Sequence, residues 1–176
     1  MHLNIEFKAR YSNLDYLREI LLKAGAEYRG RDHQIDVYFN VARGRLKLRK
    51  GNIENSLIAY EREDSLEAKQ SQVHLLQVGL EQKDVLEGIL ITTLGVKVVV
   101  DKQRDIYFIK NVKFHVDDVE RLGSFVEVEA IDFNGDIGGK RLQQQCAKYK
   151  RLLGIKNEDL VAKSYSDLLL ELQLKV

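Results

Sequence analysis

The sequence predicts an α+β protein built on an antiparallel sheet of about seven or eight strands, with about three helices. Several extended segments alternate apolar and polar residues, which is the pattern of a strand with one buried face. Most of these segments are joined by short links that contain Gly or Asn, and short links imply antiparallel pairing. Between them, runs with apolar residues at helical spacing end at a glycine.

The N-terminal half begins with a strand and a helix. Leu3 to Arg10 alternates strictly, so we expect a half-buried strand there. Ser12 is expected to cap the helix that follows, and Gly25 to end it. Three strands separated by tight turns are then expected at residues 34–41, 45–50 and 56–63.

The C-terminal half alternates helices with further strands. A polar loop is expected at residues 64–72, and a short apolar run at 73–78 leads to a helix at 81–94. Three more strands are expected at residues 96–104, 106–116 and 124–132. The closing helical elements are expected at residues 140–153, from Asn157, and at 164–174.

Size and charge limit the class of protein. With 176 residues, 44% of them hydrophobic, the chain can bury one core, and we predict a single domain, residues 1–176. Lys and Arg total 28 against 27 for Asp and Glu, so we expect neither nucleic acid nor a membrane as a partner. Cys146 is the single cysteine, and the N-terminus lacks a signal-peptide pattern, which predicts a cytoplasmic protein.

Charges on the predicted strands are sorted by sign. Arg45, Lys47 and Arg49 share one strand face, and Lys102 and Arg104 share another. Like charges on one face repel unless an anion or carboxylates lie among them, which favours a phosphate site over a solvated strand edge. If the apolar strand faces pack beneath the helices, closing the sheet makes the charged faces the lining of a polar tunnel.

An acidic row accompanies the basic ones. Glu127 and Glu129 share a face of a strand that is otherwise apolar. A divalent cation bound through oxygen relieves the repulsion between two such carboxylates, and Mg²⁺ or Mn²⁺ suits a site that phosphates complete. Ion pairs with the basic rows are the alternative. The four histidines show no ligand spacing, so a histidine-based metal site is not expected.

Six segments follow one another in a characteristic order. They are NIEFKAR, QIDVYFNVARGRLKLR, LIAYERED, VVVDKQRDIYF, FHVDDVERLGSFVEVEA and SYSDLL. Together they resemble the CYTH superfamily, the triphosphate tunnel metalloenzymes, and most of all its class IV adenylyl cyclase branch. NIEFKAR matches the signature E-x-E-x-K strand in part, because Asn4 stands in place of the first glutamate.

This resemblance implies a closed eight-stranded antiparallel β-barrel with flanking helices, whose tunnel binds a triphosphate and Mg²⁺ or Mn²⁺. The metal-binding candidates that it implies are Glu6, Glu127 and Glu129. The phosphate contacts that it implies are Lys8, Arg45, Lys47, Arg49, Arg62, Lys102 and Arg104. Asp117 matches a polar position near the site, with its role left open.

The activity implied is conversion of ATP to cyclic AMP and pyrophosphate. Two alternatives stay open: hydrolysis of thiamine triphosphate or inorganic triphosphate, and a non-catalytic module that binds a phosphorylated metabolite. The second alternative follows from Asn4, because an amide brings no charge to a metal site. The expected partner is a nucleoside triphosphate or another triphosphate, and the oligomeric state is open, a homodimer included.

Overall fold

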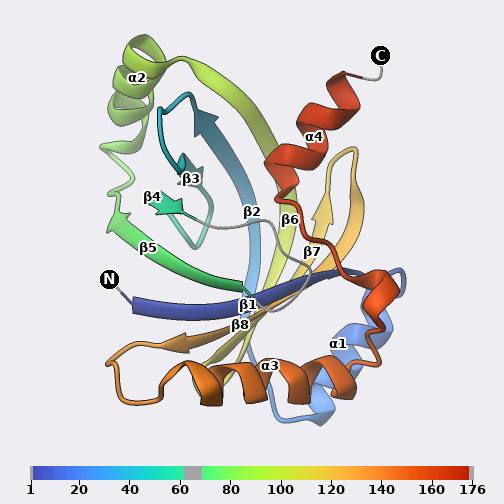
Figure 1. The fold of residues 1–176 in the computed structure, drawn as a ribbon. Coiled ribbons are helices and arrows are strands. Elements are labelled where there is room, and N and C mark those ends of the chain that lie inside the picture. Colours follow the sequence, from blue (N-terminus) through green and yellow to red (C-terminus); the bar gives the residue numbers. More distant parts are fainter. Residues whose placement is uncertain (1, 62–68, 175–176) are drawn as a thin grey trace.

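The computed structural model describes residues 2–61 and 69–174, and its centre is an eight-stranded antiparallel sheet (Figure 1). The strands are β1 (His2–Arg10), β2 (Glu27–Phe39), β3 (Arg45–Lys50), β4 (Ser56–Glu61), β5 (Lys69–Gln77), β6 (Val96–Ile109), β7 (Val112–Val119) and β8 (Gly123–Asp132). Their order is β1-β5-β4-β3-β2-β6-β7-β8, and β8 pairs back with β1, so the strands close into a barrel. The predicted α+β class is confirmed.

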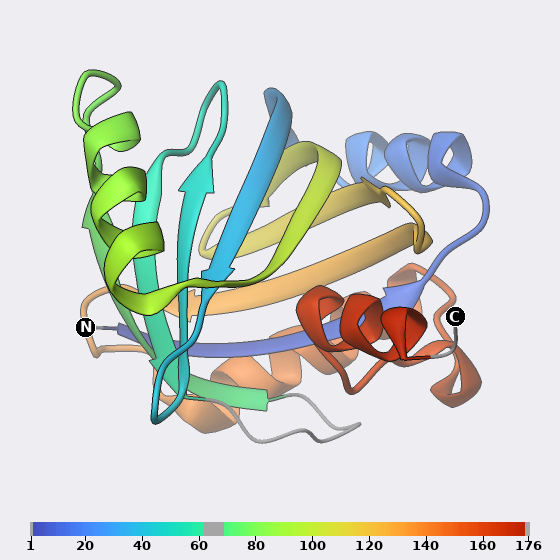
Figure 2. The ribbon, with the colours of Figure 1, turned by 90° about the horizontal axis from the view of Figure 1, so that it is seen from above.

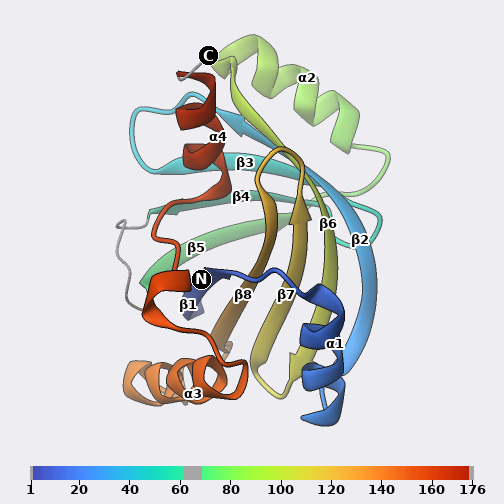
Figure 3. The same ribbon diagram turned by 90° about the vertical axis from the view of Figure 1, so that its right-hand side faces the viewer.

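Four α-helices pack against the barrel. They are α1 (Leu14–Lys23), α2 (Lys83–Leu94), α3 (Gly139–Leu152) and α4 (Tyr165–Gln173), with a short 3-10 helix at Asn157–Asp159 before α4. Helices α1 and α3 lie on one side of the barrel and α2 on the opposite side (Figures 1 and 3). None of the helices in the described ranges has the length and apolar character needed to span a membrane.

The outward strand faces carry two of the three cores. Ile5 and Phe7 on β1 belong to the largest core, together with Leu17 of α1 and Leu142 and Cys146 of α3. Cys146 is 1% exposed and is part of this core. A second core lies under α2. A third joins α4 to β6 and β8 at one end of the barrel, where Val98 and Val100 share the face of Lys102, and Phe125 shares the face of Glu127. Because the apolar faces that pack on α1, α2 and α3 point outward, the charged faces of the same strands point into the barrel.

Several predicted boundaries were wrong. β2 begins at Glu27, whereas the predicted strand began at residue 34. The first residues of β2 are mostly exposed and show no clear alternation, so periodicity could not reveal them. Residues 69–72 of the predicted polar loop belong to β5, and residues 64–68 lie outside the described ranges. Asn13, not Ser12, caps α1, since its side chain accepts the backbone N–H of Tyr16.

The break expected at Asp105 is also absent. β6 runs through this residue to Ile109, and the chain reverses at Lys110, which has a φ of 55°. Asp105 does not end the strand because its carboxylate lies on the outer face, bound by arginines that satisfy it.

Candidate charged cavity in the barrel

The inward side chains line a cavity of about 310 Å³ inside the barrel. Five of the predicted phosphate contacts line it: Lys8, Lys47, Arg49, Lys102 and Arg104. The three metal-binding candidates, Glu6, Glu127 and Glu129, line it as well. The antiparallel register brings them together, since β1 sets Lys8 opposite Glu127 and Glu6 opposite Glu129 on β8.

Three predicted site residues are placed differently. Arg45 does not line this cavity, and its Nη2 donates instead to Asp167 of α4 at 2.8 Å. Asp117 does not line it either, because it is fully buried and accepts a hydrogen bond of 2.7 Å from Nε of Arg104. Arg62 lies outside the described residues.

Asp36 of β2 is the centre of the basic cluster, and the sequence analysis did not identify it. Its carboxylate accepts hydrogen bonds from Lys47 at 2.9 Å, Arg49 at 2.8 Å and Lys102 at 2.7 Å. Burial would raise the pKa of Asp36, but Arg49, Lys102 and Lys47 outweigh it and hold that pKa well below its usual value. The repulsion within the basic row is therefore relieved by a carboxylate of the protein itself.

Lys102 shows how strongly positive this cluster remains. Its side chain is 1% exposed, and burial lowers its pKa to about 7, with Arg49 and Arg104 acting in the same direction. The single carboxylate of Asp36 opposes this shift without cancelling it. An added anion would stabilise the charged form of Lys102, which is what a phosphate site requires.

Glu127 lies in a cationic environment. It contacts Lys8 at 3.1 Å, Nη2 of Arg104 at 2.8 Å and Nδ1 of His115 at 3.3 Å. Burial would raise the pKa of Glu127, but Lys8 and Arg104 hold it well below the usual value. The ion pairs with basic residues that we gave as the alternative to metal binding are thus present at this carboxylate.

Glu129 has the opposite environment. Burial and the facing Glu6 raise the pKa of Glu129, which marks a place where positive charge is lacking. Asn4 donates a hydrogen bond from its amide nitrogen to Glu129, while its amide oxygen is buried without a hydrogen-bond partner. A hard divalent cation would satisfy the unpaired oxygen and the carboxylate pair together.

The oxygen donors around Glu129 would satisfy only part of the coordination shell of a divalent metal ion. Within the described ranges, no three His, Cys, Asp or Glu side chains form a ready-made metal site. Oxygen donors from Glu6, Glu129 and Asn4 are the hard ligands that Mg²⁺ or Mn²⁺ prefers, and Mg²⁺ commonly completes its shell with substrate phosphates. The donor set therefore fits a metal that arrives with phosphate better than one held by protein alone.

A turn between β3 and β4 brings Glu54 into the same cavity. Asp32 is fully buried and accepts the backbone N–H groups of Asn52, Ile53 and Glu54 at 2.5–3.0 Å. Gly30, with a φ of 131°, lies so close to this turn that a Cβ would come within 2.9 Å of Ile53. The turn therefore has a fixed position, and from it Glu54 accepts hydrogen bonds from Arg49 and Lys113.

His115 faces this group of charges. It is 4% exposed, its Nδ1 lies against Glu127, and its Nε2 is buried with no hydrogen-bond partner. Burial lowers the pKa of His115 to about 3, with Arg104 and Lys113 adding to the shift, so the ring is neutral near pH 7. His115 and Asp117 share one face of β7, and only the fold shows which charged groups from other strands lie beside His115.

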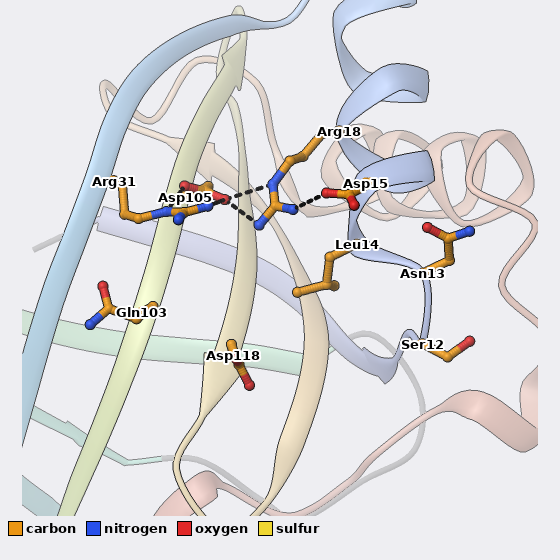
Figure 4. Close-up of a pocket in the computed structure, with 9 residues that line it drawn as sticks. All are labelled: Ser12, Asn13, Leu14, Asp15, Arg18, Arg31, Gln103, Asp105 and Asp118. Atoms are coloured by element: carbon orange, nitrogen blue, oxygen red, sulfur yellow. Dashed lines mark hydrogen bonds and ion pairs between the residues drawn. The ribbon is translucent and has the colours of Figure 1, made fainter.

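A second pocket, of about 730 Å³, lies beside α1 on the outer face of β6 (Figure 4). At its edge Asp105 accepts hydrogen bonds from Arg18 and Arg31, at 2.8 Å each, and from Tyr28 at 3.2 Å. These bonds connect α1 and β2 to β6. The Asp105 carboxylate is fully used in holding the elements together, so we assign this cluster a structural role.

The fold and the cavity define a class: an eight-stranded antiparallel barrel whose interior is lined by charged groups instead of apolar ones. A family model described as the CYTH domain matches residues 2–165. The chain therefore belongs to the CYTH family, as its sequence motifs indicated. Members of this family are typically enzymes of the adenylyl cyclase or triphosphatase type that use divalent metal ions.

Three proteins illustrate how similar this chain is to known sequences and structures. A Methanocaldococcus jannaschii protein named "Putative adenylate cyclase MJ0240" is 26% identical over 94% of this chain and 98% of its own length. The PH1012 protein of Pyrococcus horikoshii is 28% identical, with a TM-score of 0.79 over 96% of this chain and 99% of that chain. The Hippeastrum protein HpAC1, described as an adenylyl cyclase candidate with a dominant triphosphatase activity, shares the fold at 13% identity, with a TM-score of 0.63 over 100% of this chain and 97% of its own.

Proposed function

We propose that this protein is a metal-dependent enzyme that binds ATP in the barrel and converts it to cyclic AMP and pyrophosphate. The observation that carries the proposal is the meeting of five predicted phosphate contacts and three predicted metal ligands on one cavity. The family and the relative named as an adenylate cyclase support it.

In this reaction the ribose 3′-hydroxyl oxygen forms a bond to the α-phosphorus. The bond from that phosphorus to the bridging oxygen of the β-phosphate breaks, pyrophosphate leaves, and the hydroxyl proton passes to water. Lys8, Lys47 and Lys102 would hold the phosphate chain in line, and Arg104 would offset charge that develops on the phosphate oxygens. Mg²⁺ or Mn²⁺, when bound at Glu6, Glu129 and Asn4, supplies further charge neutralisation.

The proposal is tested by incubating the purified protein with ATP and Mn²⁺, or with Mg²⁺, and identifying the products. We expect cyclic AMP and pyrophosphate in equal amounts, and no product when the metal is chelated. Orthophosphate as the main product would reject the cyclase and support the second candidate.

That second candidate is hydrolysis of thiamine triphosphate or inorganic triphosphate in the same cavity. It is favoured by the triphosphatase activity described for the Hippeastrum protein of the same fold. The same incubation, carried out with thiamine triphosphate and with inorganic triphosphate, distinguishes it through release of orthophosphate.

A third candidate is a binding module without catalysis, favoured by Asn4, which is 2% exposed and supplies no charge beside Glu129. Substituting Asn4→Glu should tighten Mn²⁺ binding, because it adds a carboxylate to the proposed metal site. If turnover is detected only in Asn4→Glu, the native protein is a binder.

A further inference from the structure

His115 holds a buried atom that lacks a partner. Within the described part of the chain, three buried side-chain atoms have no hydrogen bond: Oδ1 of Asn4, Oε1 of Gln34 and Nε2 of His115. Buried polar atoms in folded proteins are nearly always paired, so each unpaired one needs an explanation. Asn4 and His115 line the cavity, and the proposed metal site already uses Asn4. The unpaired atom of His115 is the one in the cavity that the proposed function does not yet use.

The contact with Glu127 fixes the tautomer of the His115 ring. Although burial raises the pKa of Glu127, Lys8 and Arg104 outweigh it and keep this carboxylate ionised, so it can only accept hydrogen bonds. Nδ1 of His115 lies 3.3 Å from the carboxylate and therefore carries the proton. Burial also lowers the pKa of the ring and keeps it neutral near pH 7. Nε2 is thus a hydrogen-bond acceptor with a free lone pair.

This lone pair belongs to the inner side of the ring. β7 lies between β6 and β8 (Figure 2), and His115 pairs with Ile106 on β6 and with Glu127 on β8. Nδ1 is bonded to the ring carbon that joins the backbone side, whereas Nε2 lies across the ring from that carbon. Because His115 lines the cavity, Nε2 lies toward the barrel interior. Ile106 is apolar and offers Nε2 no hydrogen bond.

A free acceptor in this position needs a ligand atom that donates. Ionised phosphate oxygens only accept hydrogen bonds, so a phosphate chain among the lysines leaves Nε2 unpaired, whereas a hydroxyl satisfies it. A hydroxyl that attacks phosphorus lies next to negatively charged phosphate oxygens. A carboxylate such as Glu129 would be repelled there, but the neutral ring of His115 carries no charge that opposes the phosphate. A neutral acceptor can therefore hold a hydroxyl beside a phosphate.

We propose that Nε2 of His115 accepts a hydrogen bond from the hydroxyl that attacks phosphorus. This inference rests on the proposed function and adds a substrate-positioning residue to it. The hydroxyl is the ribose 3′-hydroxyl, and the hydrogen bond turns its oxygen toward the α-phosphorus. The 3′-oxygen forms its bond to that phosphorus, pyrophosphate leaves, and the hydroxyl proton passes to water. Glu127 contributes by holding the ring in place through Nδ1.

A binding experiment tests the hydrogen bond without turnover to cyclic AMP. Calorimetry with Mn²⁺ compares α,β-methylene-ATP, which cannot release pyrophosphate, with its 3′-deoxy form. We expect the wild type to bind the hydroxyl form about tenfold more tightly, and His115→Phe to bind the two forms equally within about twofold. Both proteins should bind inorganic triphosphate alike. His33→Phe makes the same substitution at a 43% exposed site on β2 and should keep the tenfold preference.

Turnover provides a second measurement. With ATP and Mn²⁺, His115→Phe should lower kcat by about a hundredfold, which is more than KM rises, because the hydroxyl loses its in-line orientation. His115→Gln restores a neutral acceptor of similar reach, so it should recover part of kcat and part of the preference for the 3′-hydroxyl. A variant that has lost only stability would not show this recovery.

Other outcomes would overturn the inference. A His115→Phe variant that keeps the full preference would mean that Nε2 is satisfied by an internal water only. Cyclic AMP formation by a wild type that binds the two analogues equally contradicts this inference alone. A wild type that binds neither analogue and forms no cyclic AMP contradicts the proposed function itself.

Discussion

Glu127 and Glu129 lie two residues apart on β8 and face the same cavity, yet their electrostatic environments are opposite. Lys8 and Arg104 surround the first, and Glu6 faces the second. The pKa of Glu127 is therefore lowered and that of Glu129 raised. The Glu127 carboxylate therefore stabilises the barrel when no ligand is bound. Ionising the Glu129 carboxylate is unfavourable, because burial and Glu6 oppose its charge.

Substituting each of them by glutamine should separate these roles. Glu127→Gln leaves Lys8 and Arg104 without their counter-charge, so the free energy of unfolding should fall by about 2 kcal/mol. Glu129→Gln removes a repulsion with Glu6, so stability without metal should be unchanged or higher. Urea denaturation at pH 7.5 with a chelator measures both values, and equal losses would contradict the assignment.

Lys102 provides a test of anion binding that does not depend on turnover. With a pKa of about 7, it is partly deprotonated between pH 7 and 8, and a bound polyanion should raise that pKa. Inorganic triphosphate should then bind with proton uptake at pH 7.5, and the uptake should vanish at pH 5.5, where Lys102 is already charged. Calorimetry in two buffers of different ionisation enthalpy measures it, with Lys102→Met as the control; uptake that persists in this variant would point to another group.

Among the elements, the turn between β3 and β4 depends on one side chain. Asp32 accepts the backbone N–H groups of Asn52 and Ile53 at one carboxylate oxygen and that of Glu54 at the other. In asparagine one of these oxygens becomes an amide nitrogen, which cannot accept a hydrogen bond. Asp32→Asn should therefore lower the free energy of unfolding by about 2 kcal/mol. Asp118→Asn is the matched control, because Asp118 is exposed on β7 and should lose less than about 0.5 kcal/mol. Comparable losses in the two variants would mean that the turn does not depend on Asp32.

Periodicity located most elements correctly, and its errors have physical causes. β3 was predicted at its observed bounds because alternation and turn residues agree there. The start of β2 was missed because its exposed residues carry no pattern, and the strand that was predicted to end at Arg104 continues through Asp105. Its partners, Arg18 and Arg31, come from α1 and β2, which the local sequence cannot reveal.

For the molecule as a whole, the balance of charge in the cavity determines which form of a triphosphate it favours. Among the described residues, six cationic side chains and five carboxylates line it. A triphosphate adds several negative charges to a lining that is already almost neutral. The carboxylates should thus oppose a bare triphosphate and favour one that carries metal ions.

Metal and triphosphate binding should therefore be strongly coupled. We expect affinity for inorganic triphosphate to be at least about tenfold higher with Mn²⁺ than with a chelator, which is within the usual range of coupling between sites. Calorimetry under both conditions measures the ratio, and Glu129→Gln should reduce it, because the metal loses a ligand. Equal affinities with and without metal would reject the coupling.

The sequence by itself predicted most strands and helices and the sorted rows of charge, because alternation and turn chemistry act between near neighbours. The order of six segments indicated the family. The sequence could not show that Asp36 occupies the basic cluster, that Asp167 binds Arg45, or that Glu54 enters the cavity from a turn. These contacts join residues from different strands and helices, and they exist only once the barrel has closed and fixed the distances between charges. For the same reason, the opposite pKa shifts of Glu127 and Glu129 became visible only in the fold.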